Sequence, residues 1–257
     1  MKTTFDYIDA NVFVAGGTSG INLGIAQAFA RAGARVAVAS RKQEKVDAAR
    51  ATLGDNALGY AFDVRDAENV KAALDGFAAE VGQIDVLVSG AAGNFPVLAK
   101  DLSVNGFKSV VDIDLIGTFH VMKAAYPHMK RPGGSIINIS APQSVVAMEA
   151  QLHVCAAKAG VDMLTRCLAL EWAREGLRIN AVSPGPIEGT EGMDRLAPTP
   201  EAKQAVADMV PAKRSGTPED VARACLFLGS EAADYVNGQI LAADGGWAVA
   251  GAGLPSA

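Results

Sequence analysis

The sequence predicts an α/β fold, in which helices cover both faces of one parallel sheet. Three observations favour this class. Short apolar or β-branched runs alternate with longer segments of helical periodicity along the chain. The first run leads through a glycine-rich turn directly into a helical pattern. The 257 residues are enough for one domain with a large core, and we expect residues 1–257 to form that single domain.

The expected strands are short and evenly distributed along the chain. They lie at residues 11–15, 35–40, 57–62, 84–89, 135–140, 178–183 and 239–242. Helical patterns lie near residues 21–33, 42–53, 66–81, 103–130, 150–175 and 218–228. Parallel neighbours need long crossover connections, which are right-handed, so the alternation predicts a doubly wound sheet. Ligands of such sheets bind at the carboxyl ends of the strands.

The turn after the first run is suited to a dinucleotide. Gly16 and Gly20 lack Cβ atoms, so a pyrophosphate can approach the backbone N–H groups at the positive end of the following helix. Thr18, Ser19 and Ile21 lie in the same turn and are further candidates for this contact. A glycine-rich turn alone is weak evidence, but here it lies between an expected strand and an expected helix.

The end of the second expected strand indicates which dinucleotide binds. An NAD site usually has an acid there, which holds the adenosine ribose hydroxyls. This chain has Ser40 and Arg41, and a guanidinium matches the ribose phosphate of NADPH. The alternative is that Arg41 only opens a solvated helix. Asp63 and Val64, after the third expected strand, are placed to meet the adenine ring.

Composition excludes several classes of partner. Lys and Arg number 23 against 28 acidic residues, and a net charge of −5 does not favour binding to nucleic acid or to an anionic membrane. Cys155, Cys167 and Cys225 are odd in number and widely spaced in apolar helical segments, which favours buried free thiols over disulfides or metal ligands. The acidic N-terminus lacks the core of a signal peptide, and the C-terminal LPSA is not a Ser-Lys-Leu signal, so we expect a cytoplasmic protein.

Five stretches resemble the short-chain dehydrogenase/reductase family over nearly the full chain. They are VAGGTSGINLG (14–24), SGAAG (89–93), AAKAGVDMLTRCLALEW (156–172), RINAVSPGPI (178–187) and AADGG (242–246). The resemblance implies a Rossmann-like, seven-stranded doubly wound sheet, and usually a homodimer or homotetramer. Asn22 stands where the family pattern has a third glycine, and Gly24 is expected to permit close packing of the helix on the sheet.

The resemblance also implies further cofactor contacts. Lys158 would hold the nicotinamide ribose, Pro184 and Gly185 would turn the chain over the nicotinamide, and Thr190 would meet its carboxamide. One extra residue separates Pro184 from Thr190 relative to the family spacing. The remaining family positions in contact with the cofactor are Ala91, Ala92, Gly93 and Ile187. Residues 188–215, rich in Gly, Pro and Met, are expected to form a mobile lid over the substrate.

The chain departs from the family where the proton donor normally lies. Val154 occupies the place of the tyrosine four residues before Lys158, and Ala141 occupies the place of the serine. Neither side chain can donate a proton, so a standard ketone or alcohol dehydrogenase is not expected. Asp114 is our candidate for proton handling, against the alternative that it is an ordinary helix-start aspartate. His153 is a weaker candidate that we expect to pack.

These departures resemble the 2,4-dienoyl-CoA reductases, especially the peroxisomal type. The matching stretches are AAGNF (91–95), DIDLIGTF (112–119), QLH (151–153) and PGPIEGTEG (184–192). This resemblance implies NADPH-dependent reduction of an acyl-CoA diene in fatty-acid β-oxidation, with Asp114 and Lys158 as the catalytic pair. Asn94, Phe95 and Gln143 are candidates for substrate contact. A 3-oxoacyl-type reductase and a catalytically silent NADP-binding scaffold remain alternatives, and no metal site is expected.

Overall fold

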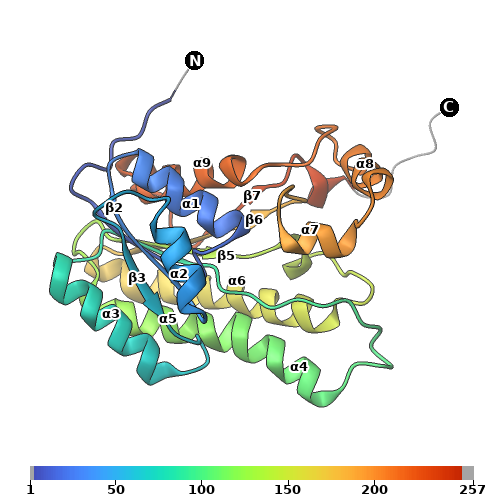
Figure 1. Ribbon diagram of the computed structural model, residues 1–257, viewed down its shortest axis with the longest axis horizontal. Coiled ribbons are helices and arrows are strands. Elements are labelled where there is room, and N and C mark those ends of the chain that lie inside the picture. Colours follow the sequence, from blue (N-terminus) through green and yellow to red (C-terminus); the bar gives the residue numbers. More distant parts are fainter. Residues whose placement is uncertain (1–2, 251–257) are drawn as a thin grey trace.

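The computed structural model describes residues 3–250 and confirms the predicted fold class (Figure 1). Seven parallel strands form one sheet in the order β3-β2-β1-β4-β5-β6-β7. The strands are β1 Asn11–Ala15, β2 Arg35–Ser40, β3 Leu58–Ala61, β4 Val86–Ser89, β5 Ser135–Ile139, β6 Arg178–Pro184 and β7 Ile240–Ala243. The chain order reverses between β1 and β4, and in such sheets this switch point opens a crevice for ligands.

Helices cover both faces of the sheet because the strands are apolar on both sides. In β1, Val12 and Val14 pack with Phe29 on one face, whereas Phe13 packs with Phe77 on the other. The first face is covered by α1 Gly20–Arg31, α2 Gln43–Arg50 and α9 Pro218–Gly229. The second is covered by α3 Ala67–Val81, α5 Gly117–Ala125 and α6 Leu152–Trp172.

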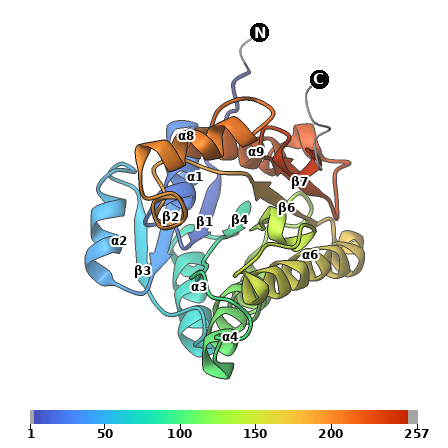
Figure 2. The same ribbon diagram turned by 90° about the vertical axis from the view of Figure 1, so that its right-hand side faces the viewer.

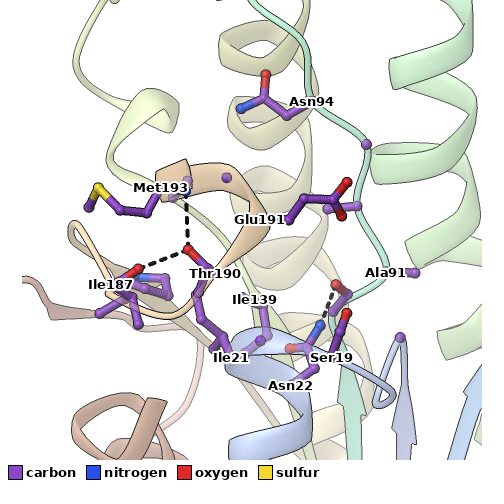
Figure 3. Close-up of a pocket in the computed structure, with 18 of the residues that line it drawn as sticks. Ser19, Ile21, Asn22, Ala91, Asn94, Ile139, Ile187, Thr190, Glu191 and Met193 are labelled. Atoms are coloured by element: carbon purple, nitrogen blue, oxygen red, sulfur yellow. Dashed lines mark hydrogen bonds between the residues drawn. The ribbon is translucent and has the colours of Figure 1, made fainter. Parts of the chain in front are cut away.

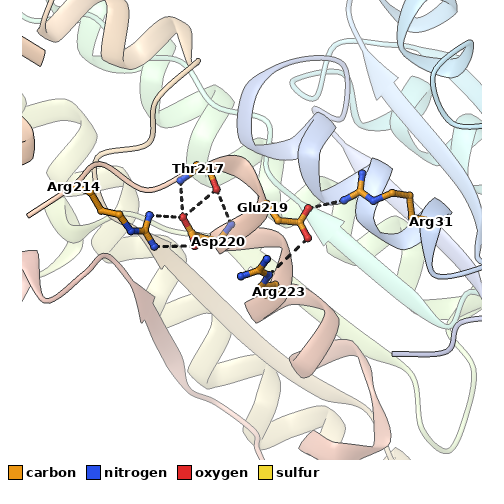
Figure 4. A network of polar contacts seen from close by, with 6 residues as sticks. All are labelled: Arg31, Arg214, Thr217, Glu219, Asp220 and Arg223. Atoms are coloured by element: carbon orange, nitrogen blue, oxygen red, sulfur yellow. Dashed lines mark hydrogen bonds and ion pairs between the residues drawn. The ribbon is translucent and has the colours of Figure 1, made fainter. Parts of the chain in front are cut away.

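Close packing of α1 on α9 corrects the role predicted for Gly24. A Cβ on Gly24 would lie 2.4 Å from Cβ of Pro218, so this glycine permits contact with α9 rather than with the sheet. Arg31 of α1 also forms an ion pair with Glu219 of α9 at 2.5 Å (Figure 4). The sequence could not reveal this contact because the partners lie 188 residues apart.

The N-terminus of α9 is held by a capping box. The Thr217 hydroxyl accepts a hydrogen bond from the Asp220 N–H, and the Asp220 carboxylate accepts one from the Thr217 N–H (Figure 4). Arg214 donates two hydrogen bonds to Asp220, at 2.7 and 3.1 Å, and this interaction is the largest cause that lowers the pKa of that carboxyl. The charge of Arg214 is therefore engaged within the chain.

The helix predicted over residues 103–130 is interrupted. α4 Val104–Val111 passes into one π-helical segment, Asp112–Ile116, before α5 begins at Gly117. A π-segment inserts an extra residue into a helical turn, and such segments are frequent at functional sites. Asp114 lies in the middle of this segment and not at a helix start. The alternative reading of Asp114 as a capping residue is therefore wrong.

The long helix α6 lies along the sheet and carries both buried and exposed polar positions. Lys158 and Asp162 are buried.

The prediction of buried thiols is only partly correct. It is wrong for Cys167, which is exposed on α6. Cys155 is half-buried, and Cys225 of α9 is fully buried. Within residues 3–250, no helix combines the length and the apolar character needed to cross a membrane.

The segment predicted as a lid contains two helices, α7 Glu191–Leu196 and α8 Pro200–Met209. Each begins at a threonine that caps it: Thr190 accepts a hydrogen bond from the Met193 N–H, and Thr199 accepts one from the Ala202 N–H. In Figures 1 and 2 these helices, coloured orange, lie together at one end of the molecule. Their helical form was not predicted, because both helices are short and their Gly and Pro content indicated a loop.

Candidate active site

A pocket of about 730 Å³ opens at the carboxyl ends of the strands, where the switch point predicts a ligand site. Every residue predicted to contact the cofactor lines it: Gly16, Thr18, Ser19, Gly20, Ile21, Arg41, Asp63, Val64, Ala91, Ala92, Gly93, Lys158, Pro184, Gly185, Ile187 and Thr190. These residues come from turns far apart in the sequence. The parallel sheet brings them together because all its strands end at the same edge.

The glycine-rich turn has the backbone geometry needed for a diphosphate. Gly16 and Gly20 have φ angles of +81° and +53°, in the region that favours glycine. The Ser19 side chain at the start of α1 makes no capping hydrogen bond, in contrast to the capped starts of α7, α8 and α9. The first N–H groups of α1 are therefore available to a ligand in the pocket.

The pocket is basic where it passes the end of β2. Arg41, Lys42 and Lys45 all line it there, and an anionic group such as a ribose phosphate fits this charge. Lys42, just before α2, and Lys45, within it, were missed by sequence reasoning because exposed lysines are usually solvated. Asp63 forms an ion pair with Arg65 at 2.6 Å, and the hydrogen bonds from Arg65 lower the pKa of its carboxyl.

Asp114 and Lys158 form a buried pair beside the pocket. The Lys158 Nζ lies 3.4 Å from the Asp114 Oδ2 and donates a hydrogen bond to the carbonyl oxygen of Ile139 at 3.0 Å. The Gly93 N–H donates to the Asp114 Oδ1 at 2.7 Å. Burial raises the pKa of Asp114, and this effect outweighs the positive charge of Lys158 and the hydrogen bond from Gly93.

The two members of this pair differ in their access to the pocket. Lys158 lines the pocket, whereas Asp114 is only 1% exposed and lies behind Gly93 and Ile113, which do line it. The Asp114 Oδ2 has no hydrogen-bond partner among the described residues. Only the lysine therefore faces a bound ligand directly, and the carboxylate can act on it through Lys158.

The described residues contain no phenol that could replace the missing family tyrosine. Val154 is buried in an apolar cluster with Val110 and Ala157, and Ala141 lines the pocket. Tyr7 donates its hydroxyl proton to the Leu226 carbonyl, and the other tyrosines also lie outside the pocket, at positions 60, 126 and 235. The absence of a tyrosine donor, predicted from sequence, is therefore a feature of the folded site.

Of the three candidates for substrate contact, two line the pocket and one does not. Asn94 and Gln143 line the pocket, and the Asn94 Oδ1 is buried without a hydrogen-bond partner (Figure 3). Phe95 does not line the pocket, and its contact with a substrate stays a prediction. Its ring packs against His153, with 4.6 Å between the ring centroids, and against the cluster around Val154. His153 is fully buried and packed there, as expected.

Thr190 lines the pocket, but its hydroxyl has other partners. It donates to the Ile187 carbonyl at 2.8 Å and accepts from the Met193 N–H at 3.2 Å (Figure 3). Its methyl group is the part nearest to Gly20. The Thr190 hydroxyl is thus engaged in the cap of α7.

Sequence reasoning missed most of the apolar wall of the pocket. The wall includes residues from the segment after β5, from α7 and α8, and from the region after β7: Met148, Met193, Leu196, Val206, Met209 and Trp247. The methionines of residues 188–215 were the one available signal, since flexible thioethers are common in adaptable binding surfaces. The pocket therefore combines a polar end at the glycine turn with an apolar end under α7 and α8.

Arg195 connects α7 to the segment after β4. It donates to the Asn94 carbonyl at 2.8 Å and forms an ion pair with Glu191 at 2.5 Å. Lys213 donates to the Asp208 carbonyl at 2.9 Å. Together with Arg214, which is paired with Asp220, these cations have partners within the chain, and none of the three lines the pocket.

Comparisons with known proteins agree with this geometry. Residues 15–248 match the family described as Enoyl-(Acyl carrier protein) reductase. The chain is 42% identical over 243 residues to the (3E)-enoyl-CoA-producing peroxisomal 2,4-dienoyl-CoA reductase of Danio rerio, covering 93% of this chain and 81% of that protein. It is also 36% identical over 255 residues to the D-threitol dehydrogenase of Mycolicibacterium smegmatis, covering 97% of both.

A solved structure shares both the fold and the sequence pattern. The crystal structure of a short chain dehydrogenase from Bacillus anthracis superposes with a TM-score of 0.86 at 38% identity, over 93% of this chain and 96% of that one. The family match, the identities and the seven-stranded parallel sheet lead to one assignment. The chain belongs to the short-chain dehydrogenase/reductase family of oxidoreductases.

Proposed function

We propose that this reductase uses NADPH to reduce a conjugated 2,4-dienoyl-CoA thioester to an enoyl-CoA, as an auxiliary enzyme of fatty-acid β-oxidation. One observation carries the proposal: a buried Asp114–Lys158 pair borders a pocket that no tyrosine lines among the described residues. The identity to 2,4-dienoyl-CoA reductases supports the same substrate class.

Reduction of a conjugated thioester suits such a site on chemical grounds. When bound, NADPH supplies a hydride, which adds to the far end of the diene. The displaced electron pair moves along the conjugated chain to the thioester oxygen, and the resulting dienolate is then protonated on carbon by one proton. No alkoxide has to be protonated beside the cofactor, so a phenol is not required. The site needs a positive charge near the developing oxyanion.

We assign that charge to Lys158. Lys158 lines the pocket and its Nζ is held by the Ile139 carbonyl at 3.0 Å, so the ammonium group is oriented before the substrate arrives. Asp114 sits behind it and, in its protonated form, supplies the proton that the dienolate takes up, through Lys158 and an ordered water, and it is reprotonated from solvent. The raised pKa of Asp114, caused by burial, brings this carboxyl closer to the pH at which it can exchange protons.

The opposite end of the pocket suits an acyl chain. Met193, Leu196 and Met209 from α7 and α8 present apolar side chains there. Asn94 and Gln143 are the polar groups that we assign to the thioester region.

We further propose a homo-oligomer, because Phe107, Ile116 and other large apolar side chains of α4 to α6 are exposed in one chain.

A paired substrate assay tests this function. Oxidation of NADPH, followed by absorbance, is expected with a 2,4-dienoyl-CoA and not with a 3-oxoacyl-CoA of equal chain length. The reason is that a 3-oxo group needs an acid for its alkoxide, and the site has Val154 and Ala141 where the family places the tyrosine and the serine. Faster turnover of the 3-oxoacyl thioester would refute the proposal. Tight NADPH binding without turnover of either substrate would indicate a silent scaffold.

The choice of NADPH over NADH is tested at Arg41. Arg41→Ala is expected to weaken NADPH binding roughly 10- to 100-fold, the loss of a hydrogen bond to a charged group, and to change NADH binding by less than about threefold. Fluorescence titration of both nucleotides measures this. Arg50→Ala, at an exposed arginine of α2 outside the pocket, is the matched control and should leave both dissociation constants unchanged. Equal losses for both nucleotides would contradict a phosphate contact.

A further inference from the structure

Asn22 stands in the glycine-rich stretch where the family pattern has a third glycine, and its side chain reaches another segment. It lies in the first turn of α1 and lines the pocket. Its Nδ2 donates a hydrogen bond to the Gly90 carbonyl at 2.7 Å (Figure 3). The Asn22 Oδ1 is buried without a partner, so the bond to Gly90 is the side chain's one hydrogen bond within residues 3–250.

Asn22 and Gly90 are complementary in size. A Cβ built on Gly90 would lie 2.3 Å from the Asn22 Oδ1, 2.5 Å from its Nδ2 and 2.6 Å from its Cγ. Side chains cannot approach that closely, so a residue larger than glycine at position 90 requires the asparagine amide to move. The amide therefore occupies the space that Gly90 leaves empty.

The stretch 90–93, which Asn22 contacts at Gly90, also contains the hydrogen-bond partner of Asp114, the Gly93 N–H. Gly90 begins the stretch 90–93, whose last residue donates its N–H to the Asp114 Oδ1 at 2.7 Å. The same stretch lies directly against the glycine turn, since a Cβ on Gly16 would be 2.8 Å from the Ala91 nitrogen. Asp114 in turn lies 3.4 Å from the Lys158 Nζ. A short series of contacts thus runs from α1 to the buried pair.

We propose that Asn22 is a positioning residue for the Asp114–Lys158 pair. Its bond to Gly90 fixes the stretch 90–93 between the nucleotide turn and the π-segment, and thereby holds the Gly93 N–H against Asp114. Loss of this bond frees the stretch to shift, which weakens the hydrogen bond that favours the ionised carboxylate. Its effect on turnover rests on the proposed reductase function, whereas its effect on stability and on NADPH binding does not.

A four-protein cycle tests the proposal: wild type, Asn22→Ala, Gly90→Ala and the double variant. Asn22→Ala at saturating NADPH is expected to lower kcat for 2,4-dienoyl-CoA about tenfold or more, because small misplacements in an active site cost up to about 100-fold. KM should change little. The apparent pKa that Asp114 contributes to the pH profile of kcat should rise, because the Gly93 N–H no longer favours the ionised carboxylate. A purely structural residue would not move that pH profile.

Gly90→Ala alone is expected to lower the midpoint of thermal unfolding and to weaken NADPH binding. Asn22→Ala should relieve both effects in the double variant, because the three atoms nearest to the new Cβ are then absent. Gln27→Ala, on the same helix and hydrogen-bonded to Thr52 instead, is the matched control and should behave as wild type. Additive effects of the two substitutions on stability and on NADPH binding would show that Asn22 and Gly90 are not coupled, and would overturn the proposed pairing of Asn22 with Gly90.

The remaining outcomes also decide the proposal. Wild-type kcat and an unshifted pH profile in Asn22→Ala would overturn the positioning role. If that protein does not fold, Asn22→Asp keeps the shape of the side chain but faces the Gly90 carbonyl with an acceptor, and the same loss of kcat is expected. Wild-type turnover in a folded Asn22→Asp would again overturn the role. If the wild type reduces no 2,4-dienoyl-CoA, the proposed function fails, and thermal unfolding and NADPH binding of the cycle still decide the pairing.

Discussion

Lys158→Met is expected to lower kcat for 2,4-dienoyl-CoA reduction about 10²–10³-fold, the usual effect of removing one donor at a developing oxyanion. Lys158 is the side chain of the buried pair that lines the pocket, and its Nζ is already held by the Ile139 carbonyl. Methionine keeps the length of the apolar stem but has no charge. Steady-state kinetics at saturating NADPH separates the loss of kcat from any loss of cofactor affinity.

A surface lysine provides the control for this substitution. Lys71→Met removes a lysine of α3 that is exposed and paired with Asp75 outside the pocket, so its kinetics should match wild type. Circular dichroism and NADPH titration show whether Lys158→Met is folded and binds its cofactor. A folded, NADPH-binding Lys158→Met that retains more than about a tenth of the wild-type kcat would exclude Lys158 as the stabilising charge.

Asp114→Asn is expected to lose activity while gaining stability at pH 7. Removal of a group that handles protons costs roughly 10²–10⁴-fold in kcat. Burial raises the pKa of Asp114 despite the nearby Lys158, so the ionised carboxylate is a net cost to the folded state at neutral pH. The asparagine oxygen can still accept the hydrogen bond from the Gly93 N–H, while an uncharged amide nitrogen replaces the Oδ2 that faces the Lys158 Nζ at 3.4 Å.

The pH dependence of this stability difference has a definite sign. In the folded protein the pKa of Asp114 lies above the ordinary value of 3.8, so the folded state binds the proton more tightly than the unfolded chain. Its contribution to the free energy of unfolding is most favourable below pH 3.8 and is lost as the pH rises through the folded-state pKa. The advantage of Asp114→Asn over wild type should therefore shrink as the pH falls from 7 towards 3.8.

Urea denaturation of both proteins across this range measures the effect. Asp112→Asn is the matched control, because Asp112 lies in the same π-segment but pairs with Lys108 outside the pocket. It should leave kcat unchanged. A stability advantage of Asp114→Asn that grows on acidification, or wild-type activity in that variant, would contradict the role assigned to the carboxylate.

Local patterns were sufficient to predict the sheet, the nucleotide turn and the adenosine side of the pocket, whereas the contacts around the nicotinamide came from the family resemblance. Residues Asn11–Ala15 form a strand, and Gly16 and Gly20 form a tight turn, because those preferences lie in the residues themselves. The strand ends then meet at one edge in any parallel sheet. This is why Arg41 and Asp63, which follow different strands, could be assigned to one pocket together with the glycine turn.

Predictions that depended on packing succeeded less often. Phe95 was expected to point towards the substrate, but its ring packs against His153 and the cluster around Val154 and does not line the pocket. Cys167 was expected to be buried, but it lies on the outward side of α6. In each case the segment was correct and the direction of the side chain was not, because direction depends on neighbours that are distant in the sequence.

The sequence by itself determined the fold class, the position of the nucleotide turn and the absence of a tyrosine before Lys158, since periodicity, glycine and residue identity are local properties. Only the tertiary structure decided that Asp112–Ile116 form a π-segment, that Asp114 is buried against the Gly93 N–H, and that the Asn22 amide fills the space beside Gly90. Burial and hydrogen bonding between distant segments exist only after the sheet has brought those segments together.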